Sequence, residues 1–125
     1  MEIHAGEWRG PKSIWDALEN GFPRRIGHGT AASEDPVLLD YLEKEQIHLE
    51  ICPTSNLLLT KYRDIRKHPV KLFKERGLNF SINTDDPGNF GCSMASEYVL
   101  LERELGSSRQ DFELIYKNSL DAAFN

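Results

Sequence analysis

Cysteine is scarce in this chain, which has only two, Cys52 and Cys92, and no Cys-x-x-Cys pair. A disulfide scaffold is therefore not expected, and a reducing compartment, the cytoplasm, is the predicted location. Long uncharged apolar runs are also missing, so no transmembrane helix is expected. The residues after Met1 include neither a basic region nor an apolar stretch, so no signal peptide is indicated.

An excess of basic residues is absent too, because 15 Lys and Arg face 20 Asp and Glu, for a net charge of −5. Affinity for nucleic acid rests mostly on neutralising phosphates, so a nucleic-acid partner is not expected. The short basic run between Lys61 and Lys67 is interrupted by Asp64 and is interpreted as a solvated face. With 39% hydrophobic and 28% charged residues, the chain can build a core. We expect one domain over residues 1–125 with no internal boundary.

Short strand patterns alternate with helical patterns along the whole chain. The predicted strands, each bounded by Gly or Pro, are Ile3–Ala5, Arg25–Gly27, His48–Cys52 and Asn79–Asn83. Helices are expected to end at Gly21, at Gly77 and at Gly106, the last of them running from Met94 to Leu105. Ser33 is expected to cap a helix entered through Pro36, and Ser108 to start a final helix, with Asp111 close to a capping box. This alternation predicts an α/β fold with a parallel sheet.

Polar residues follow each predicted strand. The clusters are His4-Ala5-Gly6-Glu7, Gly27-His28-Gly29, Cys52-Pro53-Thr54-Ser55-Asn56 and Asn83-Thr84-Asp85-Asp86-Pro87. Because the carboxyl ends of parallel strands lie on one face, these side chains are expected to converge there. Two His, one Glu and two Asp at one place could bind a metal and move protons.

Each element also has a structural interpretation when taken alone. His4 could be a strand-end histidine, Glu7 a carboxylate at a helix N-terminus, and His28 a turn residue between glycines. Asp85-Asp86-Pro87 could form a helix-entry turn. Cys52-Pro53 is expected to be structural, and His48 and His68 are expected to be surface or capping residues. The common position at strand ends favours a catalytic face.

The four motifs, taken together and in order, resemble the adenosine deaminase family. They are His-Ala-Gly-Glu at 4–7, Arg-Ile-Gly-His-Gly at 25–29, Glu-Ile-Cys-Pro-Thr-Ser-Asn at 50–56 and Ile-Asn-Thr-Asp-Asp-Pro-Gly at 82–88. The resemblance implies a zinc-dependent (β/α)8 (TIM-type) barrel hydrolase of purine metabolism, of which this chain would be the C-terminal half, roughly strands 5 to 8. It implies deamination of adenosine or deoxyadenosine to inosine or deoxyinosine plus ammonia.

The resemblance also implies roles for individual residues. His4 and Asp85 resemble zinc ligands, Glu7 the residue that protonates ring nitrogen N1, and His28 the histidine that orients the attacking water and assists its deprotonation. Gly6 resembles a glycine whose backbone lies close to the purine, and Asp86 the residue that hydrogen-bonds N7. Water addition at C6 needs a strong nucleophile, which zinc supplies by lowering the pKa of its water to about 7.

The sequence departs from the family pattern in one respect, because its four histidines form no His-x-His pair. The resemblance places two further zinc ligands on such a pair, so zinc binding and activity are expected to be weak for this chain alone. A complementary N-terminal half-barrel or self-association is the expected partner. The alternatives are an adenine or modified-adenosine deaminase of the same family, or a non-catalytic half-barrel that needs the complementary half.

Overall fold

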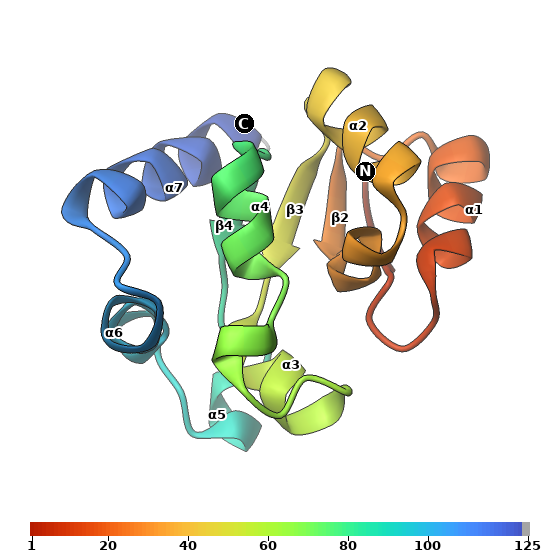
Figure 1. The fold of residues 1–125 in the computed structure, drawn as a ribbon. Coiled ribbons are helices and arrows are strands. Elements are labelled where there is room, and N and C mark those ends of the chain that lie inside the picture. Colours follow the sequence, from red (N-terminus) through yellow and green to blue (C-terminus); the bar gives the residue numbers. More distant parts are fainter. Residues whose placement is uncertain (124–125) are drawn as a thin grey trace.

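The computed structural model describes residues 1–123, which alternate strands and helices along the chain (Figure 1). The strands are β1 (Glu2–Ala5), β2 (Arg25–His28), β3 (His48–Ile51) and β4 (Phe80–Ile82). The α-helices are α1 (Pro11–Gly21), α2 (Pro36–Lys44), α3 (Pro53–Leu59), α4 (Val70–Arg76), α5 (Pro87–Phe90), α6 (Met94–Leu105) and α7 (Arg109–Ala122). Two 3-10 turns, η1 (Thr30–Glu34) and η2 (Ile65–Lys67), complete the described elements.

The four strands form one parallel sheet in the order β1-β2-β3-β4, as the alternating pattern predicts. The register aligns His4 with Gly27 and Ala5 with His28, and it aligns Ile51 with Ile82 on the other side of the sheet. The strand ends therefore lie level with one another. In Figure 1 the arrows of β2 and β3 point to the bottom of the view, where the short helices α3 and α5 lie. The α/β class and the four strand positions are confirmed.

α6 begins and ends where local signals predict, and α7 begins where they predict. Ser93 and Ser108 each cap a helix by accepting a backbone hydrogen bond, and in both cases the side chain three residues on returns the bond. Reciprocal caps of this kind satisfy two backbone N–H groups at a helix start. Gly106 ends α6 in the left-handed conformation with φ 62°, and Gly77 ends α4 with φ 70°. α7 then packs along β4, where Asn118 Nδ2 donates to the Phe80 carbonyl.

One predicted cap is wrong. Asp35, not Ser33, caps α2, because its carboxylate accepts from the N–H groups of Val37 and Leu38 while Ser33 lies within η1. Gly21 is the last residue of α1, and the left-handed residue after it is Phe22 with φ 47°. Gly21 matters for a different reason: a Cβ there would lie 2.3 Å from Ile3 Cδ1.

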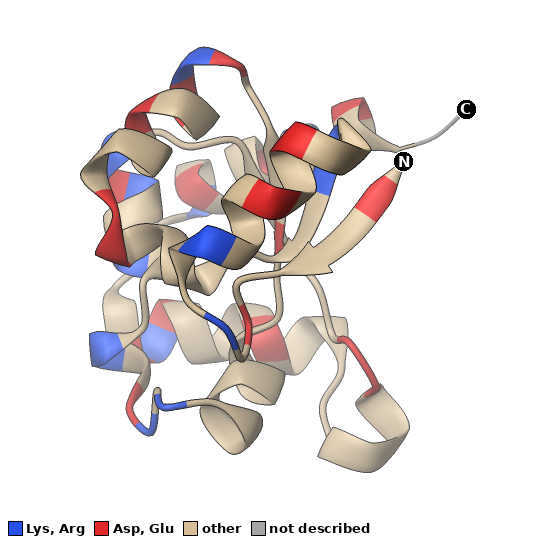
Figure 2. Ribbon diagram, turned by 90° about the vertical axis from the view of Figure 1, so that its right-hand side faces the viewer, with Lys and Arg blue, Asp and Glu red and all other residues tan. Residues whose placement is uncertain are grey.

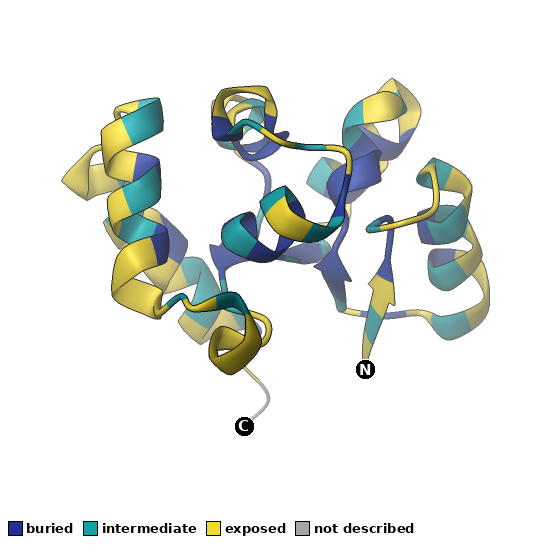
Figure 3. Ribbon diagram, turned by 90° about the horizontal axis from the view of Figure 1, so that it is seen from below, coloured by how far each residue is buried: buried dark blue, intermediate teal, exposed yellow. Residues whose placement is uncertain are grey.

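Buried residues concentrate on the central strands and on the inward faces of the helices (Figure 3). β1 is exposed along most of its length and forms one edge of the sheet. His48 and His68 are buried, so a surface position is wrong for both, although His68 does accept the N–H of Val70 as a capping residue would. His48 instead bonds Asn79 and Ser81 across the sheet.

Acidic and basic residues are interspersed over the helices (Figure 2). Many form exposed ion pairs, such as Lys12 with Asp16 and Arg76 with Asp40. Pairs of this kind contribute little to stability. No helix within residues 1–123 is both long enough and apolar enough to cross a membrane.

Candidate active site

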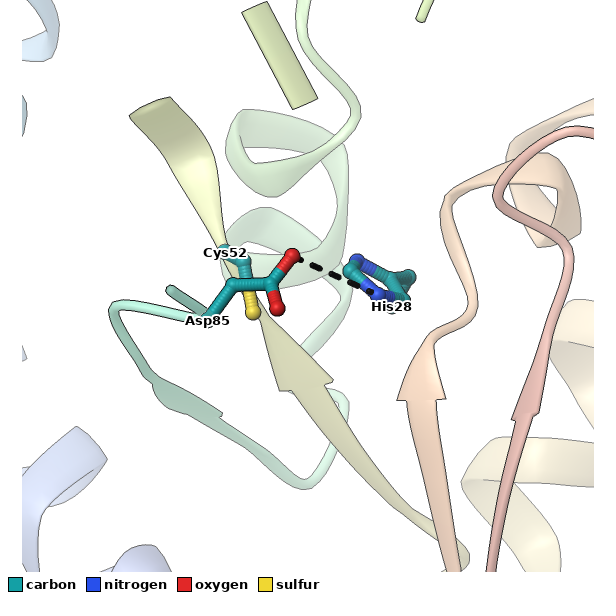
Figure 4. A group of neighbouring side chains, drawn as sticks. All are labelled: His28, Cys52 and Asp85. Atoms are coloured by element: carbon teal, nitrogen blue, oxygen red, sulfur yellow. Dashed lines mark ion pairs between the residues drawn. The ribbon is translucent and has the colours of Figure 1, made fainter. Parts of the chain in front are cut away.

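The carboxyl ends of β1, β2 and β4 bring Glu7, His28 and Asp85 together. Glu7 Oε2 lies 3.6 Å from His28 Nε2, and Asp85 Oδ2 lies 4.0 Å from the same nitrogen. His28 is the last residue of β2, Glu7 follows β1, and Asp85 follows β4. The Asp85 carboxylate is directed at the imidazole in Figure 4. The expected convergence of these strand ends is therefore present in the fold.

His4 lies beside His28, with ring centroids 5.0 Å apart and the rings nearly perpendicular. Its imidazole rests over the backbone of Gly27, where a Cβ would come within 2.6 Å of His4 Cδ2. His4 Nε2 is 3.4 Å from Glu2 Oε1. Gly27 therefore makes room for a neighbouring imidazole. Gly29 similarly makes room for Leu49, whose Cδ2 would lie 2.8 Å from an added Cβ.

His28 and Asp85 both have left-handed backbones, with φ 65° and 59°. Only two other non-glycine residues in the described part of the chain, Phe22 and Gln46, share this conformation. A side chain in this region costs about 1 kcal/mol or more, and such residues concentrate at functional sites. His28 and Asp85, two of the four residues in this conformation, belong to the same cluster. The backbone is therefore strained where the polar side chains meet.

Ser55 and Asn56, at the start of α3, hold the two central side chains of the site. Ser55 Oγ donates to Asp85 Oδ2 over 2.7 Å, and Asn56 Nδ2 lies 3.2 Å from His28 Nδ1. Both residues are fully buried. Neither residue was predicted to have an individual role, although both belong to the polar cluster that follows the third predicted strand. α3 is itself held by Glu97 of α6, which accepts the Thr54 N–H.

Burial lowers the pKa of His28, and the nearby Glu7 carboxylate opposes this shift only in part. The imidazole is 2% exposed, and desolvation disfavours its charged form. The neutral form is therefore favoured, and one ring nitrogen then donates while the other accepts. Neutral imidazole is also the form that binds metal ions.

The donor atoms of His28, Cys52 and Asp85 all lie within 4.8 Å of one another. Burial raises the pKa of the Cys52 thiol, and Asp85 adds to the shift. The thiol donates to the Glu50 carbonyl at 3.6 Å, which agrees with the structural role expected for Cys52. Imidazole and carboxylate groups are ligand types that zinc accepts, so the donors gathered here suit a metal ion.

A cleft of about 340 Å³ opens over this cluster, lined by His4, His28, Cys52, Asp85 and Met94 among others. Gly6 and Glu7 line a neighbouring cleft of similar volume together with Trp8, Thr30 and Tyr62. Volumes of this size are at the lower end of the range for small-molecule sites.

The two predicted substrate-binding residues, Gly6 and Asp86, lie at the margin of the cluster. Gly6 has φ 70°; its N–H donates to Ser13 Oγ, and its carbonyl accepts from Thr30 Oγ1. Asp86 is exposed and caps α5 by accepting the Asn89 N–H. The structure thus brings Asp86 to the helix-entry turn rather than into contact with His28.

Known proteins resemble this chain over its whole length. The family model described as adenosine deaminase matches residues 1–125. An aminodeoxyfutalosine deaminase from Streptomyces avermitilis is 43% identical over 97% of this chain and 34% of its own length. An adenosine deaminase from Escherichia coli O1:K1 is 43% identical over 99% of this chain and 37% of its own.

A solved structure of adenine deaminase from Arthrobacter aurescens superimposes with a TM-score of 0.95 at 31% identity, covering 99% of this chain and 38% of that one. The N6-methyl-AMP deaminase from Arabidopsis thaliana gives a TM-score of 0.86 at 32% identity, covering 99% and 36%. The chain thus spans about a third of the length of the relatives it matches. With the whole chain matched by the family model and the strand-end cluster in place, this chain belongs to the adenosine deaminase family.

Proposed function

We propose that residues 1–125 supply the acid/base groups and part of the zinc site of a hydrolase that removes the amino group from a purine. The cluster of Glu7, His28 and Asp85 around His28 Nε2 carries this proposal. The four strands would correspond to strands 5 to 8 of a (β/α)8 barrel, which supports its catalytic site at the carboxyl ends of its strands.

His4 and Asp85 would hold zinc, and two further ligands would come from a His-x-His pair outside residues 1–125. Bound zinc supplies an activated water at neutral pH. Ser55 supports the ligand role of Asp85 because its hydroxyl donates to Oδ2 and fixes the carboxylate. Gly27 supports His4 because the missing side chain leaves space for the imidazole.

Glu7 would protonate the purine ring nitrogen N1 as water adds at C6, which is work for a carboxylic acid. Its position supports this role, because it lines one cleft and its carboxylate lies 3.6 Å from His28, which lines the cleft over the cluster. Gly6 precedes it and would place backbone against the purine. Asp86 would contact N7 after leaving its cap on α5, where it now accepts the Asn89 N–H.

The substrate class that the relatives share is a purine with an exocyclic amino group. Relatives with 43% identity carry names that differ in substrate, one for adenosine and one for aminodeoxyfutalosine. Adenosine or deoxyadenosine is our preferred substrate, and free adenine or a modified adenosine is the alternative, supported by the adenine deaminase structure.

The test measures, with zinc present, ammonia release from adenosine, deoxyadenosine and adenine, and methylamine release from N6-methyl-AMP. The chain is assayed alone and after co-expression with the part of the Escherichia coli enzyme outside the matched region. Glu7→Gln is the matched variant, because it keeps the shape of the side chain and removes the acid. We expect turnover in the co-expressed complex and loss of about 100-fold or more in the variant. A folded complex that holds zinc and deaminates none of these purines would refute the proposal.

A further inference from the structure

A continuous line of hydrogen bonds leads from a backbone amide to the histidine at the centre of the site. The Val70 N–H donates to His68 Nδ1 over 3.1 Å, and His68 Nε2 lies 3.2 Å from Asn56 Oδ1. Asn56 Nδ2 then lies 3.2 Å from His28 Nδ1. Asn56 is fully buried and both imidazoles are 2% exposed, so bulk water does not compete for these groups. The relay links the start of α4 through α3 to the end of β2.

The direction of every bond in this relay is set by its first member, because a backbone N–H can only donate. His68 Nδ1 must therefore accept, and a neutral imidazole that accepts at one nitrogen carries its proton on the other. His68 Nε2–H then donates to Asn56 Oδ1. The amide of Asn56 consequently presents its NH2 group to His28, whose Nδ1 accepts.

The opposite direction fails on the same geometry. If the Asn56 amide were turned over, its NH2 group would face His68 Nε2, and both nitrogens of His68 would have to accept. No neutral or protonated imidazole can do this. A second proton on His28 would likewise point its Nδ1–H at the NH2 group of Asn56.

We infer that Asn56 and His68 are positioning residues that hold His28 in the tautomer with its proton on Nε2, so that His28 donates a hydrogen bond into the cleft. Nε2 is the nitrogen that faces Glu7 Oε2 at 3.6 Å and Asp85 Oδ2 at 4.0 Å. This inference rests on the proposed function, in which His28 orients the attacking water. A proton on Nε2 makes His28 the hydrogen-bond donor to that water. The groups that can accept a proton from that water are then the carboxylates.

The same argument gives the opposite tautomer for His48, which provides an internal comparison. Asn79 Nδ2 donates to the Gln46 carbonyl over 3.2 Å, which turns Asn79 Oδ1 towards His48 Nδ1 at 2.8 Å. His48 must therefore carry its proton on Nδ1, and its Nε2 accepts from Ser81 Oγ at 2.9 Å. Two buried histidines, His28 and His48, are thus expected in different tautomers because their Nδ1 atoms face different groups, an amide NH2 and an amide oxygen.

The experiment is long-range proton–nitrogen NMR on protein labelled with 15N-histidine, recorded near pH 8 and assigned with single His→Gln variants. The protonated and unprotonated nitrogens of a neutral imidazole resonate far apart, so each tautomer is read directly. We expect Nε2–H for His28 and His68 and Nδ1–H for His48. His28 protonated on Nδ1, or on both nitrogens, would overturn the inference whether or not the protein deaminates a purine.

Asn56→Asp changes the polarity of the relay with little change in shape, because a carboxylate only accepts. We expect the His28 proton to move to Nδ1 in this variant while His48 keeps its tautomer. Asn20→Asp, at an exposed residue of α1, is the control and should leave all tautomers unchanged. An unaltered His28 tautomer in folded Asn56→Asp protein would exclude control by Asn56. If circular dichroism shows that variant unfolded, the wild-type pattern alone decides.

Discussion

His68 should make the protein measurably less stable as the pH falls. Burial lowers its pKa from 6.5 to about 3 in the folded chain. Between these two values the unfolded chain binds a proton that the folded chain excludes, so the free energy of unfolding decreases with decreasing pH. The stability that depends on neutral His68 is fully present above pH 6.5. It is lost progressively as the pH falls from there to the folded pKa of about 3.

The magnitude follows from the size of the shift. At pH 5 the medium is about one and a half pH units below the unfolded pKa, and each unit corresponds to about 1.36 kcal/mol. Going from pH 7 to pH 5 should therefore remove about 2 kcal/mol through this one side chain. That loss is a large fraction of a typical free energy of unfolding.

His68→Asn isolates this effect, because the Asn side-chain oxygen can still accept the Val70 N–H while nothing at the position titrates. Urea unfolding followed by tryptophan fluorescence at pH 5, 6, 7 and 8 gives the difference in stability from wild type. We expect the variant to be less stable at pH 8 and the difference to shift by about 2 kcal/mol in its favour at pH 5. Val70→Ala, which removes buried methyl groups and no titrating group, should show a constant difference. A constant difference for His68→Asn as well would refute the reasoning.

Three further perturbations concern the metal ligands and their supports, and zinc affinities are measured on the co-expressed complex. Asp85→Gly should be more stable than Asp85→Ala by about 1 kcal/mol in urea unfolding, because only glycine adopts φ 59° without strain; equal stabilities would count against that strain. Ser55→Ala should weaken zinc binding by about 10- to 100-fold in chelator competition, and unchanged affinity would remove Ser55 from the support of Asp85. Gly27→Ala should displace the His4 imidazole and weaken zinc binding, with a stability change of about 1 kcal/mol or less. Gly10→Ala, where an added methyl meets nothing within 4 Å, is its control, and equal zinc affinity in the two variants would contradict the displacement.

Local signals were sufficient for the elements whose ends are determined by neighbouring residues. The caps at Ser93 and Ser108 and the left-handed end at Gly106 involve only contacts within a few residues. α6 therefore begins and ends as expected, and α7 begins as expected. α2 begins at Pro36 as expected, but its cap was assigned to the wrong residue because Ser33 and Asp35 stand close together. Asp35 directly precedes Pro36 and so has the geometry to cap, whereas Ser33 is held within a preceding turn.

Burial of the histidines could not be read from local sequence, because it depends on distant partners. His48 is satisfied by Asn79 and Ser81 from the far side of a long crossover, and His68 by Asn56. A polar side chain looks like a surface residue until the groups that satisfy its hydrogen bonds are known. The short helix α3 was missed for a related reason, since its polar first turn reads as a loop.

The convergence of Glu7, His28 and Asp85 could be predicted because it depends only on the parallel sheet, which the alternating pattern indicates. Their orientation could not be, because it depends on φ 65° at His28, φ 59° at Asp85 and the bonds from Asn56 and Ser55. The side chain of each of these two strained residues also has a hydrogen-bond partner at the start of α3. The hydrogen bonds from α3 therefore oppose the relaxation that the strain favours. A substitution in α3 should thus alter the site even where it leaves every predicted catalytic residue in place.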